Sequence, residues 1–250
     1  MENENTGKKI SQSEKTNEKN LEHLHIAIIT IGTITNFNPS NILVGKDSLV
    51  AFEEGFAVRM QATNATVAAE KASVEAQTAA FKIVPRKVTR ILNAVKGQGI
   101  SIEALAHLMN TVRSLRGARV DRNTPDTTPD GEAKQTHSVS QQSIAGILEH
   151  LDILDEQLKL IPTYKPNETE FQTASISAWI DDLREVRNTR LDAKIASVNA
   201  RHDRDQFGYG AEGLIVRMNM LKAYVETILD KSDPRYKTIK GLKFVDTTNK

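Results

Sequence analysis

The chain has 250 residues, of which 39% are hydrophobic and 26% are charged, and its formal net charge is +1. This balance is typical of a globular protein, and a near-neutral chain has no general attraction to nucleic acid or to an anionic membrane. The absence of cysteine excludes disulfides, thiolate metal sites and cysteine nucleophiles.

Residues 1–20 are polar and carry equal numbers of acidic and basic side chains, so we predict a disordered tail. They contain no apolar segment like that of a secretory signal. The most apolar run of the chain, residues 26–34, has nine residues, whereas a membrane-spanning helix needs about 20. We therefore expect a cytoplasmic protein.

An internal repeat begins directly after this tail. The sequence Leu-Glu-His-Leu at residues 21–24 recurs at residues 148–151, an offset of 127, and apolar and turn positions go on matching without a gap. The matched pairs include Ile26 and Ile153, Phe37 and Tyr164, Pro39 and Pro166, and Phe52 and Trp179. The pattern predicts a tandem duplication: repeat 1 at residues 21–122, a polar linker at 123–138, and repeat 2 at 139–246.

Each repeat is predicted to contain three helices. The first helix ends at an aromatic-x-Pro turn, because the residue before proline is driven out of the helical conformation. The second is long, and in repeat 1 a short helix capped by Ser101 follows the third. The predicted ranges are 15–34, 42–81 and 86–97 in repeat 1, and 140–161, 168–204 and 212–231 in repeat 2. We expect an all-α fold in which the duplicated three-helix unit forms an elongated helical bundle.

Residues 26–31 are the one ambiguous segment. Their run of isoleucines alone is typical of a buried strand, because β-branched residues favour strands. The matching residues 153–158 have helical periodicity, so the repeat predicts a helix for both.

Three segments resemble a known group of proteins. They are Ser-Val-Ser-Gln-Gln-Ser at 138–143, Tyr-Lys-Pro-Asn-Glu at 164–168 and Ser-Asp-Pro-Arg-Tyr-Lys at 232–237. Together they resemble a group of bacterial proteins, common in Bacteroidota, that share this duplicated helical layout and have no established activity. The resemblance implies the architecture and a bacterial cytoplasmic origin, and it implies no cofactor or site.

No motif predicts an enzyme. His23 and His25 could ligate a metal, but two residues apart on a helix they point about 200° from each other, and helical ligand pairs sit at i, i+3 or i+4. Since His23 is matched by His150, we expect a structural role in both repeats. The sequence Gly-Gln-Gly at 97–99 is too short for a dinucleotide-binding loop and is typical of a helix end. We expect no catalytic residue, cofactor or metal.

The charge is uneven along the chain. Residues 82–122 hold nine basic and two acidic side chains, and residues 123–156 hold seven acidic and one basic. A basic patch could contact phosphates, but the interleaved aromatic residues of a single-strand reader are absent. We favour the interpretation that the basic segment faces the acidic one. The candidate basic patch consists of Arg86, Lys87, Arg90, Arg113, Arg116 and Arg119.

Two helix faces are candidates for packing. Alanines of the long helix of repeat 1, at residues 62, 65, 69, 72, 76 and 79, follow the 3,4 spacing of a coiled-coil seam. We expect internal packing there, with a second subunit as the alternative. The other face is the candidate partner-binding face of the first helix, formed by His25, Ile28, Ile29 and Gly32. Repeat 2 has the charged residues Asp152, Asp155, Glu156 and Lys159 at those positions, which predicts a face toward water.

The first helix of repeat 1 is thus apolar nearly all round and needs a cover. The cover is either repeat 2 or another protein, and the sequence leaves both open, with the internal one favoured. The hypothesis that follows is a non-catalytic helical protein that acts by helix packing with itself or with a protein partner. The alternatives are nucleic-acid binding through residues 82–122 and a membrane-active helical protein, and we expect neither nucleic acid nor a membrane to be the partner.

Overall fold

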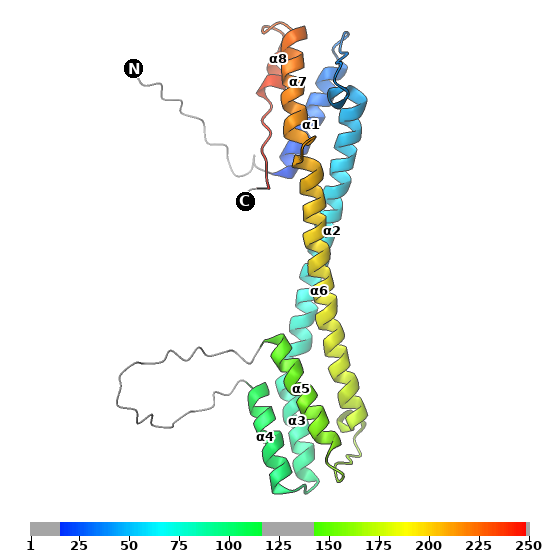
Figure 1. The fold of residues 1–250 in the computed structure, drawn as a ribbon, viewed down its shortest axis with the longest axis vertical. Coiled ribbons are helices and arrows are strands. Elements are labelled where there is room, and N and C mark those ends of the chain that lie inside the picture. Colours follow the sequence, from blue (N-terminus) through cyan, green and yellow to red (C-terminus); the bar gives the residue numbers. More distant parts are fainter. Residues whose placement is uncertain (1–15, 117–142, 249–250) are drawn as a thin grey trace, which may run out of the picture. The chain divides into compact units, whose positions relative to one another are not determined.

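The computed structural model describes residues 16–116 and 143–248, and within these ranges the chain is all-α (Figure 1). There are no strands in these ranges. The helices are α1 (Asn17–Gly32), α2 (Lys46–Lys82), α3 (Val84–Gly97), α4 (Ile102–Leu115), α5 (Ile144–Lys159), α6 (Thr173–Tyr209), α7 (Leu214–Ile228) and α8 (Pro234–Gly241). Two short 3₁₀ helices, η2 (Ile42–Val44) and η3 (Thr169–Phe171), precede the two long helices.

The described residues fall into two compact units. Unit 1 combines residues 16–69 with 194–248, and unit 2 combines residues 70–116 with 143–193. The long helices α2 and α6 therefore contribute one part to each unit. The predicted repeats 21–122 and 139–246 do not coincide with these units, because each unit takes elements from both. The predicted linker at 123–138 lies outside the described residues, as do all but the last five residues of the predicted tail.

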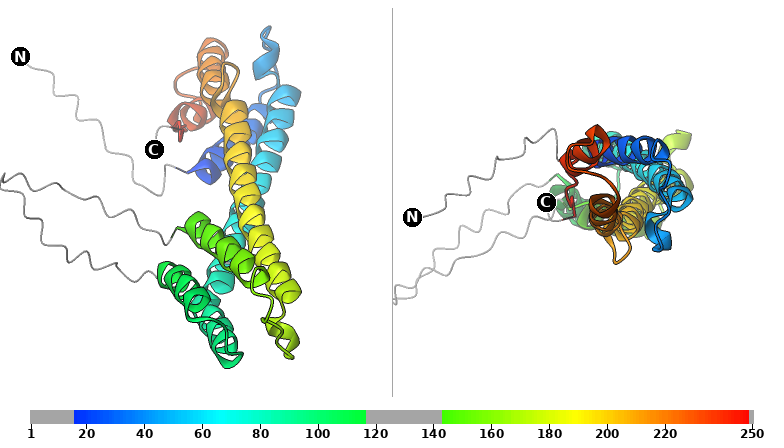
Figure 2. Two further views of the ribbon diagram at one scale, coloured as in Figure 1. Left: turned by 60° about the horizontal axis from the view of Figure 1, so that its bottom comes forward. Right: turned by 90° about the horizontal axis from the view of Figure 1, so that it is seen from above.

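The core of unit 1 is built from α1, the first part of α2, the last part of α6, and α7 with α8. Phe56 is fully buried, and so are Leu24 of α1 and Leu214 of α7. Apolar residues of α1 recur at i, i+3, i+4 and i+7, at Leu24, Ala27, Ile28 and Ile31, which gives the helix one buried stripe. Helix α8 lies beside α1, as two of the views show (Figures 1 and 2).

The core of unit 2 is built from α3, α4, α5 and the adjoining parts of α2 and α6. Helix α3 presents Val84, Val88, Ile91 and Val95 to it, as the helical spacing predicts. Helix α4 packs against both α3 and α5. The aromatic residues Tyr164, Phe171 and Trp179 complete this core from the segment that leads into α6.

Local signals in the sequence explain several helix ends. The hydroxyls of Thr16, Ser101 and Ser143 each accept a hydrogen bond from a backbone N–H in the first turn of the helix that follows, which satisfies one of its otherwise unpaired donors. Helix α3 ends at Gly97, and Gly99 then adopts φ +66°, a conformation that glycine reaches without strain. The predicted helix-ending role of this Gly-Gln-Gly segment is confirmed.

Corresponding elements in the two halves of the chain have the same length. Helices α1 and α5 both have 16 residues, α2 and α6 both have 37, and η2 and η3 both have three. Their first residues, 17 and 144, 42 and 169, and 46 and 173, are 127 apart in every case. The sequence offset of 127 is thus kept as far as Tyr209, well past the matched segment seen in the sequence.

Contacts also recur between the halves. The Lys87 ammonium lies 4.3 Å from the ring centroid of Trp179, and the Arg217 guanidinium lies 4.7 Å from that of Phe52, which is 127 residues before Trp179. A second pair sits at the turns after α1 and α5. There the backbone N–H before each proline donates to a side chain of the third helix: Lys165 to Gln98 at 2.8 Å, and Asn38 to Tyr224 at 3.1 Å.

The structure confirms most of the predicted helices and corrects others. Residues 26–31 are helical, and the short helix capped by Ser101 is present as α4. The prediction ended the long helix of repeat 2 at residue 204, whereas α6 continues to Tyr209, and it missed α8. Helix α8 starts with Asp233 as its cap and Pro234 as its first residue, a start signal that was overlooked.

The C-terminal segment is held on α1 by Asn20, whose side chain is 1% exposed. Its amide nitrogen donates to the Tyr209 hydroxyl and to the Val245 carbonyl, both at 2.7 Å, and its oxygen accepts from the Val245 N–H at 3.1 Å. Nearby, His23 Nδ1 lies 2.7 Å from the Lys243 carbonyl oxygen. A buried amide with these partners satisfies the backbone of a segment that has no helix or sheet of its own.

Asn20→Ala should therefore lower the free energy of unfolding by about 2 kcal/mol, because it leaves the Val245 backbone groups and the Tyr209 hydroxyl without their partner. Denaturant unfolding measures this, and hydrogen exchange at the Val245 amide should accelerate more than exchange in the core of unit 2. Lys19→Ala is the control. It removes only an exposed pair with Glu22 and should change stability by less than about 0.5 kcal/mol. Equal effects of the two variants would contradict the anchoring role.

Candidate functional site

The structure splits the predicted partner-binding face of α1. Ile28 is 6% exposed and lies in the core of unit 1, whereas Ile29 is 57% exposed. His25 is exposed, and its Nδ1 lies 2.8 Å from the Glu53 carboxylate of α2. Gly32 is exposed at the end of the helix. The part of the face that matters for folding is thus covered within unit 1, and Ile29 is its exposed apolar residue.

The matching position in α5 corrects the idea of a charged face toward water. Asp155 is 6% exposed, and its Oδ2 accepts from the Ser177 hydroxyl and from Lys159, at 2.7 and 2.8 Å. These hydrogen bonds raise the pKa of Lys159. In unit 1 the residues 127 positions earlier are Ile28 and Val50, which both pack in its core. The difference between the halves is therefore a buried polar pair against a buried apolar pair.

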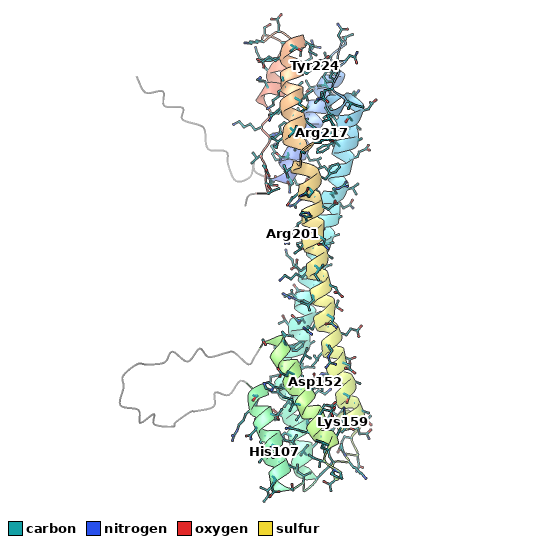
Figure 3. All side chains as sticks on the ribbon, in the orientation of Figure 1. His107, Asp152, Lys159, Arg201, Arg217 and Tyr224 are labelled. Carbon is teal, nitrogen blue, oxygen red and sulfur yellow. The ribbon has the colours of Figure 1, made fainter. Side chains whose placement is uncertain are left out.

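The other charged residues of that face do lie at the surface. Figure 3 shows Asp152 and Lys159 on α5. Asp152 pairs with Arg184 of α6 at 2.7 Å, and Glu156 pairs with Lys159 at 2.9 Å.

The candidate basic patch is only partly available to a partner. The Lys87 ammonium covers Trp179, and burial lowers the pKa of Lys87. Arg90 pairs with Glu170, and Arg116 donates to the Thr89 hydroxyl at 2.8 Å. The remaining members are Arg86 and Arg113, which are exposed, and Arg119, which lies outside the described residues.

The expected pairing of the basic segment with the acidic one is not what holds α4 and α5 together. Their contact is built from Leu108, Val112 and Leu115 of α4 with apolar residues of α5. Within 82–116 and 143–156, no ion pair joins the two segments. Apolar periodicity decides this contact, since side chains at the edge of a helical stripe keep their charges in water.

The alanine face of α2 is exposed rather than packed internally. All six of its alanines, at residues 62, 65, 69, 72, 76 and 79, are exposed. The side of α2 that meets α6 carries small polar residues instead: Thr63 is buried and donates to the Ala200 carbonyl at 3.1 Å. The expectation of internal packing is therefore wrong, and the alanines form a face of small side chains in contact with solvent.

Sequence reasoning missed a pocket in unit 1 at the start of α7. It has a volume of about 400 Å³ and is lined by Ser48, Ala51 and Phe52 of α2, Gln206 and Phe207 of α6, and Glu212, Gly213 and Arg217. The Phe52 and Phe207 rings stack with centroids 4.9 Å apart. Arg217 is 9% exposed, and burial lowers its pKa. The side chain of Arg217 can be located on α7 in Figure 3.

One signal could have drawn attention to Arg217. The third helices match at an offset of 130, not 127, so three residues are inserted in the turn before α7. That turn includes Gly213, where a Cβ would lie only 2.6 Å from the Gly208 carbonyl oxygen, so the chain passes too close for a side chain. Arg217 stands on the buried side of α7 next to this inserted turn.

The described residues offer no other obvious chemistry. They contain no group of three or more His, Asp or Glu side chains placed to hold a metal ion. The His23 and His25 rings have separate partners, the Lys243 carbonyl and Glu53. None of the helices in these ranges is both long enough and apolar enough to cross a membrane.

Comparison of the chain with protein-family models, with curated proteins and with solved structures gives no match.

The split face of α1 leads to a test. Ile28→Asp should lower the free energy of unfolding by at least about 3 kcal/mol, because it places a carboxylate in an apolar core and removes a buried aliphatic side chain. Ile29→Glu should change it by less than about 0.5 kcal/mol, since the side chain is in solvent. Denaturant unfolding of both variants measures the contrast.

A further variant makes the comparison sharper. Adding Val50→Ser to Ile28→Asp gives the buried carboxylate the hydroxyl partner that Asp155 has, and should restore part of the lost stability. A double variant no more stable than Ile28→Asp would contradict the equivalence of the two positions.

Proposed function

We propose that the protein is a non-catalytic helical protein that associates with a second copy of itself through the alanine face of α2. The observation that supports this proposal is the exposure of all six alanines on one helix at coiled-coil spacing. Small side chains let a second helix approach closely, and a close approach brings more atoms into van der Waals contact. The partner that the spacing fits is another α-helix with the same narrow face.

Flanking residues favour a second copy over an unrelated helix. Val58 is 62% exposed, four residues before Ala62, and it continues the 3,4 spacing of the face toward the start of α2. Ile83, four residues after Ala79, is 53% exposed and continues it beyond the other end. A face with no charged residue at any of these positions offers no charge pattern for choosing a different partner, and identical faces are self-complementary across a two-fold axis.

The proposal includes a tandem duplication of the chain. It is supported by the equal lengths of corresponding helices, by their constant offset, and by the recurring cation–aromatic contacts of Lys87 and Arg217. A duplicated helical layout that carries no catalytic motif suits a scaffold or interaction role. Nucleic-acid binding finds less support, because Lys87, Arg90 and Arg116 are engaged within unit 2.

The proposal predicts that the mass measured by light scattering rises with protein concentration toward that of a dimer. Ala65→Glu combined with Ala72→Glu should weaken this association at least about tenfold, because four carboxylates would be buried in the dimer. Both positions are exposed and glutamate suits a helix, so circular dichroism should show an unchanged fold.

Thr78→Glu is the matched control, since Thr78 is exposed on α2 but lies off the alanine face. It adds the same charge to the same helix and should leave the association unchanged. A wild-type chain that stays monomeric at millimolar concentration would refute the proposal. So would equal weakening by the control.

A further inference from the structure

The pocket at the start of α7 combines three kinds of lining within one unit. Arg217 supplies a cation, Glu212 supplies an acid, and Phe52 with Phe207 and Ala51 supplies an apolar wall. Its volume of about 400 Å³ falls in the range of small-molecule sites, about 300 to 1,000 Å³. This site is independent of the alanine face that carries the proposed function.

The Arg217 guanidinium is fixed in place but not saturated. Its Nε donates to the Glu212 carbonyl at 2.7 Å, and its Nη1 donates to the Leu43 carbonyl at 2.8 Å and to the Ser48 hydroxyl at 3.0 Å. Its Nη2 makes no hydrogen bond to the described residues. All of its acceptors are neutral, and a guanidinium that is nine-tenths buried favours a carboxylate partner.

The acid of the pocket lies close by without neutralising this cation. The Glu212 side chain is exposed at the rim, and its charge opposes the effect of burial on the Arg217 pKa. No ion pair joins Glu212 to Arg217 in the described structure; only the Glu212 backbone carbonyl contacts the guanidinium. The pocket therefore presents two opposite charges to an occupant rather than to each other.

The apolar wall is rigid. Arg59 lies 4.0 Å from the Phe207 ring centroid, and Arg217 lies 4.7 Å from that of Phe52, so each of the two stacked rings is held by a guanidinium. Rigid aromatic walls offer contact area at a low entropic cost, which suits an apolar group.

These features belong to unit 1 and not to its counterpart. At the positions 127 residues before Gln206 and Phe207, the chain has Ala79 and Ala80, and 130 residues before Arg217 it has Lys87. Only Ile83 separates α2 from α3, so no residue there corresponds to Glu212. A pure packing role would not need an arginine, a bulky ring and an inserted acidic turn together.

We propose that this pocket binds a free α-amino acid with an apolar side chain. Its carboxylate meets Nη2 of Arg217, its ammonium faces Glu212, and its side chain lies against Phe207 and Ala51. This single class of ligand uses the cation, the acid and the apolar wall at once. A simple anion would leave the wall unused and would be repelled by Glu212.

The test uses the full-length protein and L-leucine, with equilibrium dialysis of the labelled amino acid as the measurement. Leucine should bind saturably with one site per chain. L-Leucinamide, which lacks the carboxylate, and N-acetyl-L-leucine, which lacks the ammonium, should each compete at least about tenfold more weakly. Inorganic phosphate should not compete. Absence of leucine and phenylalanine binding at 10 mM (about the weakest affinity worth assigning), or equal competition by phosphate, would overturn the proposal.

Variants taken from the counterpart positions locate the site. Arg217→Lys and Phe207→Ala should each weaken leucine binding at least about tenfold, because the first loses the planar two-nitrogen donor and the second loses the wall. The reciprocal change Lys87→Arg in unit 2 is the matched control and should leave binding unchanged. Binding of leucine that Arg217→Lys leaves intact would place the amino acid elsewhere and refute the assignment. The leucine derivatives keep the proposal testable even if a variant fails to fold.

Discussion

The length of α2 and α6 is the constraint on which the rest of the structure depends. A helix of 37 residues extends about 55 Å, whereas a 16-residue helix such as α1 or α5 extends about 24 Å. No short helix can cover a long one from end to end. Each long helix therefore needs two different sets of neighbours, and the chain builds two cores in place of one. The apolar content of α2 follows this demand, with Phe52 and Phe56 in the core of unit 1 and Phe81 in that of unit 2.

Between their apolar ends the long helices carry smaller and more polar side chains. In unit 1, α2 meets α6 through Thr63, which donates to the Ala200 carbonyl, and through the fully buried Ser197. In unit 2, Ser73 is buried on the same side of α2. Small polar residues allow close helix contact but bury little apolar area, so they stabilise less than the core residues do. This distribution leaves the alanines of α2 outside both cores.

Helical periodicity was enough to predict the fold class and the core stripes, because the spacing of Leu24, Ile28 and Ile31, or of Val84, Val88 and Ile91, reflects one-sided burial directly. The internal offset also predicted the helix at residues 26–31 against its β-branched composition. Periodicity failed where polarity and burial part company. Asp155 reads as a solvent-facing residue in any pattern, yet Ser177 and Lys159 satisfy it inside the unit.

The opposite failure concerns the alanines. Their spacing predicts a seam, but spacing does not say whether the seam is filled by the same chain, and in this chain Thr63 and Ser73 occupy the inner side instead. The pocket was beyond sequence reasoning for a related reason. Its residues come from α2, from the end of α6 and from the start of α7, and only the packing of those helices brings Ser48, Phe207 and Arg217 together. A single arginine among the apolar residues of α7 carries no spacing signal of its own.

The two units have diverged in opposite directions from their matched layout. Unit 2 has acquired a polar pair inside its core, where Asp155 and Ser177 stand in place of Ile28 and Val50, and that pair is closed off by Lys159. Unit 1 keeps an apolar core at those positions and places its buried charge at Arg217, on the wall of an open pocket. A buried charge with all its partners inside the protein serves structure, because nothing remains for a ligand to satisfy. A buried charge that keeps a donor toward a pocket costs desolvation energy without full compensation, and a ligand that supplies the missing partner recovers it. On this argument the polar change in unit 2 is a matter of packing, and the functional divergence of the duplicated layout lies in unit 1.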